Sequence, residues 1–235
     1  MRKLTLIVPI ILVAISCANN NHNNDNNRAQ MLELRSQIQL PDSCLQFDSI
    51  GLGMKFRDAK VIVATDSDFC EVREFTQGED SVIEFKHNFY LYDGDVTGFT
   101  GKIIEYQDSV EKIELMSMSS GYDFPIREQG IFLKVAKTYA EKYGYEPAMN
   151  QHDINPNTKL YEYSWKKEYN VVTVSFEVET LHTESGKLLY TGKVSIKYLD
   201  EVLNRERLEE LRLQREKENE EIYKANKEKL NQQNI

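Results

Sequence analysis

A period of two in apolar and polar residues constrains the fold of this chain more than any other feature. In SVIEFKHNFYLY, residues 81–92, charged and polar side chains take one face and the other face is almost wholly apolar. The apolar face consists of Ile83, Phe85, His87, Phe89 and Leu91. Such alternation is typical of a strand with one buried side. CEVREF precedes this segment, and FTGKIIEY and VEKIELMSMS follow it after turn-forming residues, so residues 69–119 are predicted to form an antiparallel meander.

A helical period replaces the alternation between residues 127 and 143. Ile131, Val135, Tyr139 and Tyr143 recur every three to four residues, with Pro125 before them and Gly144 after them. A loop rich in Asn, Pro and Asp then leads to three more alternating segments, LYEYSWKKEY, VVTVSFEVETL and KLLYTGKVSIKYL. The predicted fold is α+β, with two helix-plus-antiparallel-meander units forming a sheet flanked by helices.

The C-terminal region, residues 201–235, is rich in Glu, Arg, Lys and Gln. Its helix propensity is high, but its apolar residues are too widely spaced for the continuous seam of a coiled coil. We therefore predict a charged, solvated helix that packs at its first turns and frays later. Residues 41–200 are predicted to form the globular domain that precedes this tail.

The N-terminus has the layout of a secretory signal segment. Arg2 and Lys3 precede a mostly apolar run, Leu4–Ile15, that is too short to span a bilayer core of about 30 Å. Ala14-Ile15-Ser16-Cys17 resembles the lipobox of bacterial lipoproteins. That resemblance implies removal of residues 1–16 and acylation of Cys17, whereas the alternative is an ordinary signal peptide cut elsewhere. Two or more acyl chains are enough for stable anchoring in a membrane.

Residues 17–40 are predicted to be a flexible tether behind the lipidated cysteine. Asn19–Asn27 is polar and lacks aromatic residues, so it cannot bury enough surface to fold. Ala18 follows Cys17 where many lipoproteins retained in the inner membrane carry aspartate, which favours the outer membrane. The sequence leaves open whether the protein faces the periplasm or the cell exterior.

Composition excludes some partners. The formal net charge is −9 at pH 7 with His neutral. An acidic chain argues against nucleic acid as a partner and against electrostatic docking on anionic lipid.

Cys44 and Cys70 are the cysteines besides Cys17. An even pair in an oxidising compartment is compatible with a disulfide, and two unpaired buried thiols are the alternative. A catalytic cysteine needs a nearby base, and neither sequence neighbourhood provides one.

Three short motifs carry a resemblance to a known family. They are Leu52-Gly53-Met54, Lys142-Tyr143-Gly144 with Pro147 three residues later, and Trp165 followed by VVTVSF. They resemble motifs of small Gram-negative lipoproteins, although one extra residue precedes the proline. The helix-then-meander order is similar to the BamE (SmpA) outer-membrane-assembly lipoproteins and to tandem β-lactamase-inhibitor proteins. The resemblance implies binding of other proteins without catalytic residues.

Two candidates for metal or acid–base chemistry have simpler structural explanations. Asp93, Asp95, Thr97 and Gly98 match the first positions of a calcium loop, but position twelve, where a glutamate is needed, is Ile104. A hairpin turn is the better interpretation. His87 is favoured as a hydrogen-bonded core or groove histidine, because the sequence places no nucleophile or paired acid beside it. The sequence therefore predicts no metal, no cofactor and no catalytic residues.

The triplets Asp48-Ser49-Ile50, Asp80-Ser81-Val82 and Asp108-Ser109-Val110 resemble an O-glycosylation signal of some Gram-negative anaerobes. That resemblance would make Ser49, Ser81 and Ser109 acceptors. The alternative is that Asp-Ser is a turn pair before a strand.

Taken together, these patterns predict a non-catalytic, lipid-anchored envelope protein whose sheet binds another envelope protein. The alternative from a different class is a small-molecule or glycan binder that uses the tyrosines and Trp165. An enzyme ranks third, because no convergent catalytic set is visible.

Overall fold

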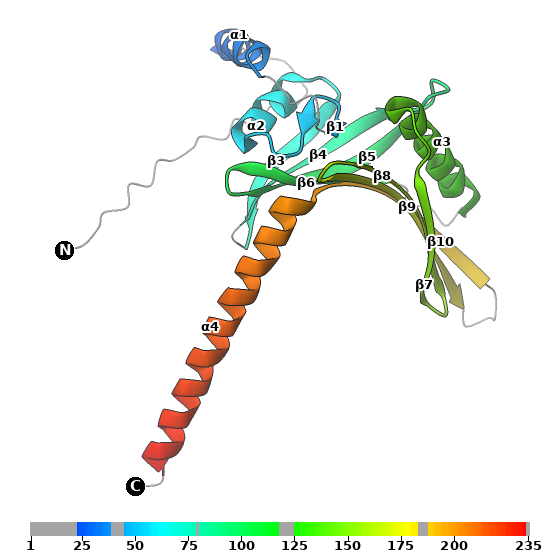
Figure 1. Cartoon of the computed structure of the whole chain (residues 1–235). Helices are drawn as coiled ribbons and strands as arrows, with labels where there is room; N and C mark the ends of the chain where they lie inside the picture. The colour runs from blue at the N-terminus through cyan, green and yellow to red at the C-terminus, as the bar shows by residue number, and fades with distance from the viewer. Residues whose placement is uncertain (1–22, 39–44, 79, 118–124, 183–187, 234–235) are drawn as a thin grey trace.

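The computed structural model describes residues 23–38, 45–78, 80–117, 125–182 and 188–233, and its fold is α+β (Figure 1). The helices are α1 (Asn23–Ser36), α2 (Phe56–Thr65), α3 (Pro125–Tyr143) and α4 (Glu201–Gln233). The first strands are β1 (Gln46–Phe47), β2 (Ile50–Gly51), β3 (Phe69–Gln77), β4 (Asp80–Tyr90), β5 (Val96–Tyr106) and β6 (Ser109–Ser117). The later strands are β7 (Ala148–Asn155), β8 (Thr158–Lys167), β9 (Asn170–His182) and β10 (Leu188–Asp200).

Eight strands form one antiparallel sheet in the order β3-β4-β5-β6-β10-β9-β8-β7. β6, the last strand before α3, and β10, the last strand before α4, pair at the middle of this sheet. Ile113 lies opposite Tyr198 there, and Leu115 lies opposite Ile196. β1 and β2 pair separately as a two-stranded hairpin, the β1–β2 hairpin. The large sheet is arched, with α2 and α3 on one face and α4 leaving from the other side (Figure 1).

The core lies between the sheet and the helices α2 and α3. Alternate residues of β4 and β9, among them Phe85, His87, Val172 and Val174, are buried as the period of two predicts. α3 contributes Phe132, Val135 and Tyr139 from one stripe, so the predicted helix of residues 127–143 is confirmed. Gly144 follows α3 with a φ of 72°, the left-handed conformation of a helix C-cap, and donates its N–H to Ala140 O.

The sequence predicted three strands after α3, and the structure has four. β7 was missed because all of its residues are exposed, so no alternation of apolar residues marks it. It is an edge strand that pairs only with β8.

The two terminal helices also differ from the prediction. α1 forms within the segment predicted to be a flexible tether, because residues 28–35 include good helix formers and Arg35 binds Asp66 beyond α2. α4 continues to Gln233 instead of fraying, and pairs such as Arg212 with Glu209 and Glu216 support its exposed middle. Its first turns do pack on the sheet, through Arg207. In the described part of the chain, no helix is both long and apolar enough to cross a membrane.

Candidate functional site

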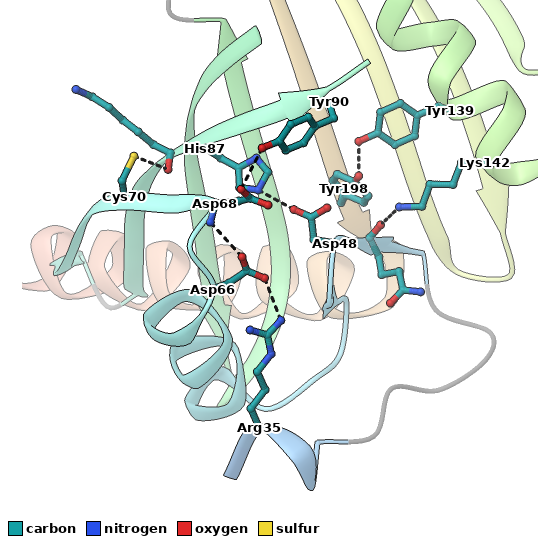
Figure 2. Close-up of polar contacts among 12 residues, drawn as sticks. Arg35, Asp48, Asp66, Asp68, Cys70, His87, Tyr90, Tyr139, Lys142 and Tyr198 are labelled. Carbon is teal, nitrogen blue, oxygen red and sulfur yellow. Dashed lines mark hydrogen bonds and ion pairs between the residues drawn. The ribbon is translucent and has the colours of Figure 1, made fainter. Parts of the chain in front are cut away.

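A hollow of about 170 Å³ lies beside the β1–β2 hairpin and is lined by carboxylate, imidazole, phenol and ammonium groups. We call it the His87 hollow. Its walls come from the β1–β2 hairpin, the segment before β3, β4, α3 and β10. Segments far apart in sequence therefore meet here, and Figure 2 shows their side chains pointing toward one another.

Asp48 and His87 face each other across the hollow. Asp48 occupies the turn of the β1–β2 hairpin with a φ of 50°, a conformation that Asp and Asn tolerate better than most residues. Its Oδ2 lies 2.7 Å from His87 Nε2 (Figure 2). The carboxylate is about half exposed and the imidazole is 3 % exposed. The hollow thus joins a solvated acid to a buried base.

Aromatic rings hold the imidazole in place. Phe47 and Phe69 lie with ring centroids 4.8 and 4.7 Å from that of His87, both edge-on. The alignment with Asp48 is too poor for a hydrogen bond, and neither buried ring nitrogen of His87 has a hydrogen-bond partner among the described residues. Buried polar atoms are normally paired, so this histidine is unusual. The core or groove position predicted for His87 is confirmed, but the predicted hydrogen bonding is not met.

Two tyrosines close the floor of the hollow. Tyr139 from α3 and Tyr198 from β10 share a hydrogen bond between their hydroxyl groups (Figure 2). Burial raises the pKa of both hydroxyls well above the ordinary value for tyrosine, because the phenolate would be poorly solvated. Both remain neutral, and they provide a fixed polar pair on an otherwise aromatic surface.

Lys142 stands at the entrance. Its Nζ donates a hydrogen bond to Gln46 O at 2.8 Å, which ties α3 to the β1–β2 hairpin. Desolvation by the surrounding side chains lowers the pKa of the Lys142 ammonium, and the nearby Asp48 carboxylate opposes that effect.

A second acidic pair lies beside the hollow. Tyr90 donates its hydroxyl to Asp68 Oδ1 at 3.4 Å, and Asp68 N donates to Asp66 Oδ1 at 3.1 Å. Asp66 in turn binds Arg35 at 2.9 Å (Figure 2). Arg35 of α1 therefore neutralises the Asp66 carboxylate. Asp68 is the second carboxylate that lines the hollow, after Asp48.

The hollow holds carboxylates, an imidazole, phenols and an ammonium group, but its lining includes no cysteine or serine. Its only aliphatic hydroxyl, that of Thr138, donates to Lys134 O within α3. No group of three His, Cys, Asp or Glu side chains suited to a metal ion is present in the described ranges. The arrangement is suited to binding a polar molecule rather than to nucleophilic attack.

The calcium-loop candidate is a hairpin turn. Asp93 and Asp95 lie between β4 and β5, where both carboxylates contact Lys134 of α3. The ammonium group of Lys134 therefore neutralises these two carboxylates. The hairpin interpretation of the sequence is confirmed, because Tyr90 pairs with Val96 across this turn.

The predicted modification and disulfide residues are spread over the molecule. Cys17 and Cys44 lie outside the described residues, so the proposed lipidation and the Cys44–Cys70 disulfide stay predictions. Cys70 is half buried at the start of β3, with its Sγ 3.6 Å from Lys86 O. Ser49, Ser81 and Ser109 are half buried at strand starts or turns, and Asp48 and Asp108 have positive φ angles.

A second candidate surface is the face of the sheet opposite α2 and α3, which we call the open face. One cross-strand row runs Glu84, Lys102, Glu114, Lys197, Thr173 and Ser164. A neighbouring row brings Ser175 and Ser195 together, with hydroxyl oxygens 2.7 Å apart. The open face is therefore polar, with short hydroxyl side chains at its centre and charged side chains around them.

The sequence pointed to His87 but not to the residues that form the hollow around it. Asp48, Asp68 and Lys142 lie in a turn, a loop and a helix end, and no sequence spacing connects them. The one available signal was the histidine itself, a titratable residue on an otherwise apolar strand face.

No family model, no curated protein and no solved structure matches this chain.

Proposed function

We propose that this chain is a lipid-anchored, non-catalytic outer-membrane lipoprotein that binds another envelope protein through its open face. The lipobox-like sequence ending at Cys17 supports the anchor. The part of the open face that no helix covers supports the binding role. α2 and α3 cover the opposite face, and the first turns of α4 pack on the open side near Asp80 and Glu111 (Figure 1).

The single observation that carries the proposal is the composition of the open face. Lys102 projects from β5, and Lys193 and Lys197 project from β10 on the other side of β6; the last two are exposed. They flank the serine and threonine row in a protein whose net charge is −9. Short hydroxyl groups let a partner approach the strands closely, and the alternating lysine and glutamate side chains of this face favour a partner with complementary charges of both signs.

We further propose that the sheet consists of two helix-plus-meander units. The order α2, β3, β4, β5, β6 parallels the order α3, β7, β8, β9, β10. The final strands of the two series pair antiparallel at the middle of the sheet, as expected for two units related by a two-fold axis.

Lipidation can be tested by metabolic labelling. The full chain should incorporate radiolabelled palmitate and fractionate with the outer membrane. A Cys17→Ala variant should lose both properties, because the acylated thiol is removed. Label retained in Cys17→Ala would exclude the proposed anchor.

The docking surface can be tested with two matched triple variants. Lys102, Lys193 and Lys197 are changed to Glu in one, and Arg215, Lys217 and Lys224 of the exposed part of α4 in the other. Both make the same change in net charge. A partner recovered stoichiometrically from native envelopes with the unaltered chain should be lost only with the open-face variant. Equal recovery with both variants would remove the open face as the docking surface.

O-glycosylation of Ser49, Ser81 and Ser109 stays a separate proposal. It rests on the three Asp-Ser-aliphatic triplets. An intact mass from the native host equal to that of the acylated polypeptide alone would exclude it.

A further inference from the structure

The charge of the His87 hollow selects one class of small molecule. Two carboxylates, those of Asp48 and Asp68, line it together with one ammonium group, that of Lys142. The carboxylates in this lining outnumber the ammonium group by two to one. A monovalent cation would neutralise this lining, whereas an anion would be repelled by it.

The aromatic lining favours an organic cation over a metal ion. The rings of Phe47, Phe89, Tyr90 and Tyr139 all border the same hollow. The face of an aromatic ring attracts ammonium groups, and quaternary ammonium groups are bound in this way by clusters of aromatic side chains. Metal ions instead need several oxygen, nitrogen or sulfur ligands at fixed distances.

His87 is an independent sign that a ligand belongs here. It lines the hollow and is 3 % exposed. Its Nε2 lies 2.7 Å from Asp48 Oδ2 without hydrogen-bond alignment, and its Nδ1 has no hydrogen-bond partner in the described part of the chain. Buried polar atoms normally have a hydrogen-bond partner, because an unpaired one destabilises the fold. A hydroxyl or similar group of a bound molecule would supply the missing hydrogen bond.

The volume limits the size of that molecule. The hollow measures about 170 Å³. A protein cavity of about 150 Å³ accommodates a benzene ring, so six to eight non-hydrogen atoms is roughly the upper size.

We propose that the His87 hollow binds a small organic ammonium compound that also carries a hydroxyl group. Its cationic end lies between Asp48, Asp68 and the aromatic rings, and its polar end faces His87. This site is separate from the open face, so either proposal can fail without the other.

The first test compares choline with its neutral carbon isostere, in which a tert-butyl group replaces the trimethylammonium group. The full chain in detergent is titrated with each, and NMR follows the indole N–H of Trp165, whose ring lies 5.7 Å from that of Tyr139. We expect choline to bind with a Kd on the order of 1 mM, and the isostere at least about tenfold more weakly. Equal affinities, or no choline binding at about 50 mM, would overturn the proposal.

A matched pair of variants tests the position of the site. Asp48→Asn removes one carboxylate at a position with φ 50°, and Asp108→Asn makes the same change at an exposed turn with φ 59° outside the hollow. Asparagine tolerates this backbone conformation, so both variants should fold. We expect Asp48→Asn to weaken choline binding about tenfold or more, and Asp108→Asn to leave it within about twofold. Equal weakening in both would place binding elsewhere.

The same ammonium group occurs free and on lipid headgroups. Glycerophosphocholine is therefore titrated beside choline under the same conditions. Glycerophosphocholine exceeds the size limit of the hollow and its choline hydroxyl is esterified, so we expect it to bind more weakly than choline, which indicates a free ammonium compound as the ligand. Tighter binding would indicate a lipid headgroup and would overturn the size limit and the hydrogen bond to His87.

Discussion

At the scale of single residues, Gly101 on β5 shows how tightly the core is packed. A Cβ atom added there would lie 2.3 Å from two ring carbons of Phe85 and 2.8 Å from a methyl carbon of Leu115. No rotamer change at position 101 relieves such a contact, because Cβ is fixed by the backbone. Gly130 on α3, by contrast, has no atom within 4 Å of its added Cβ.

These two glycines give a paired prediction. Gly101→Ala should lower the free energy of unfolding by about 2 kcal/mol or more through overpacking. Gly130→Ala should raise it by about 0.5–1 kcal/mol, because alanine favours the helix and restricts the unfolded chain. Urea unfolding followed by Trp165 fluorescence measures both. Equal stabilities of the two variants would contradict the packing around β5.

Residue-level prediction from the sequence succeeded where burial follows a simple period. Ile83, Phe85 and His87 were placed correctly on the buried face of their strand. The contact between His87 and Asp48 was not predictable, because it joins a strand to a hairpin turn 39 positions earlier, a pairing set only by the tertiary fold. Polar residues that meet in this way carry no periodic signal.

At the scale of elements, the β4–β5 hairpin is clamped onto α3. Lys134 Nζ lies 2.7 Å from Asp93 Oδ2 and also contacts Asp95, while Lys137 Nζ lies 3.9 Å from the ring centre of Tyr92. The hydrogen bond from Lys134 lowers the pKa of the Asp93 carboxyl. The hydrogen bonds to Asp93 and Asp95 raise the pKa of the Lys134 ammonium group. The clamp joins the first meander to α3.

This clamp has a defined pH dependence. The Asp93 pKa is lower in the folded chain than its ordinary value of 3.8, so the contact stabilises the fold above that value. The stabilisation is lost as pH falls from that value through the lower folded-state pKa. Lys134→Met should return the Asp93 pKa toward its ordinary value in a carboxyl NMR titration. Lys137→Met, which leaves the ion pair intact, should not; an unchanged Asp93 pKa in Lys134→Met would contradict the clamp.

Several polar contacts fix α4 to the sheet, and Arg207 makes the most buried of them. Arg207 Nη1 lies 2.8 Å from Glu111 Oε2, and its other terminal nitrogen contacts Asp80. Glu111 is fully buried, and the strand register shifts beside it, so the bulge turns its carboxylate toward α4. Without the guanidinium group, that carboxylate would be buried and unpaired.

Arg207→Met should therefore cost about 3 kcal/mol of unfolding free energy and loosen the first turns of α4. Arg212→Ala, at a 61 % exposed position on the same helix, should change the unfolding free energy by about 0.5 kcal/mol or less. Chemical denaturation gives the free energies, and amide hydrogen exchange reports on the start of α4. Comparable losses in both variants would mean that Arg207 is not the anchor.

At the scale of the whole molecule, the sequence predicted an α+β fold with a C-terminal charged helix, and the structure confirms both. Periodicity identifies strands that bury one face, which is why β4, β9 and β10 were found and the fully exposed β7 was not. Strand order was not predictable, because the β6–β10 pairing depends on contacts between residues about 80 positions apart that local patterns do not encode.

The most direct test of the account is site-specific photo-crosslinking in native envelopes. A photoreactive residue replaces Lys197 or Thr173 on the open face, or Leu133 on the outer side of α3, where it is 51 % exposed. We expect both open-face positions to crosslink to the same envelope protein and Leu133 to give no such product. Crosslinking from Leu133 alone, or from none of the three positions, would contradict docking through the open face.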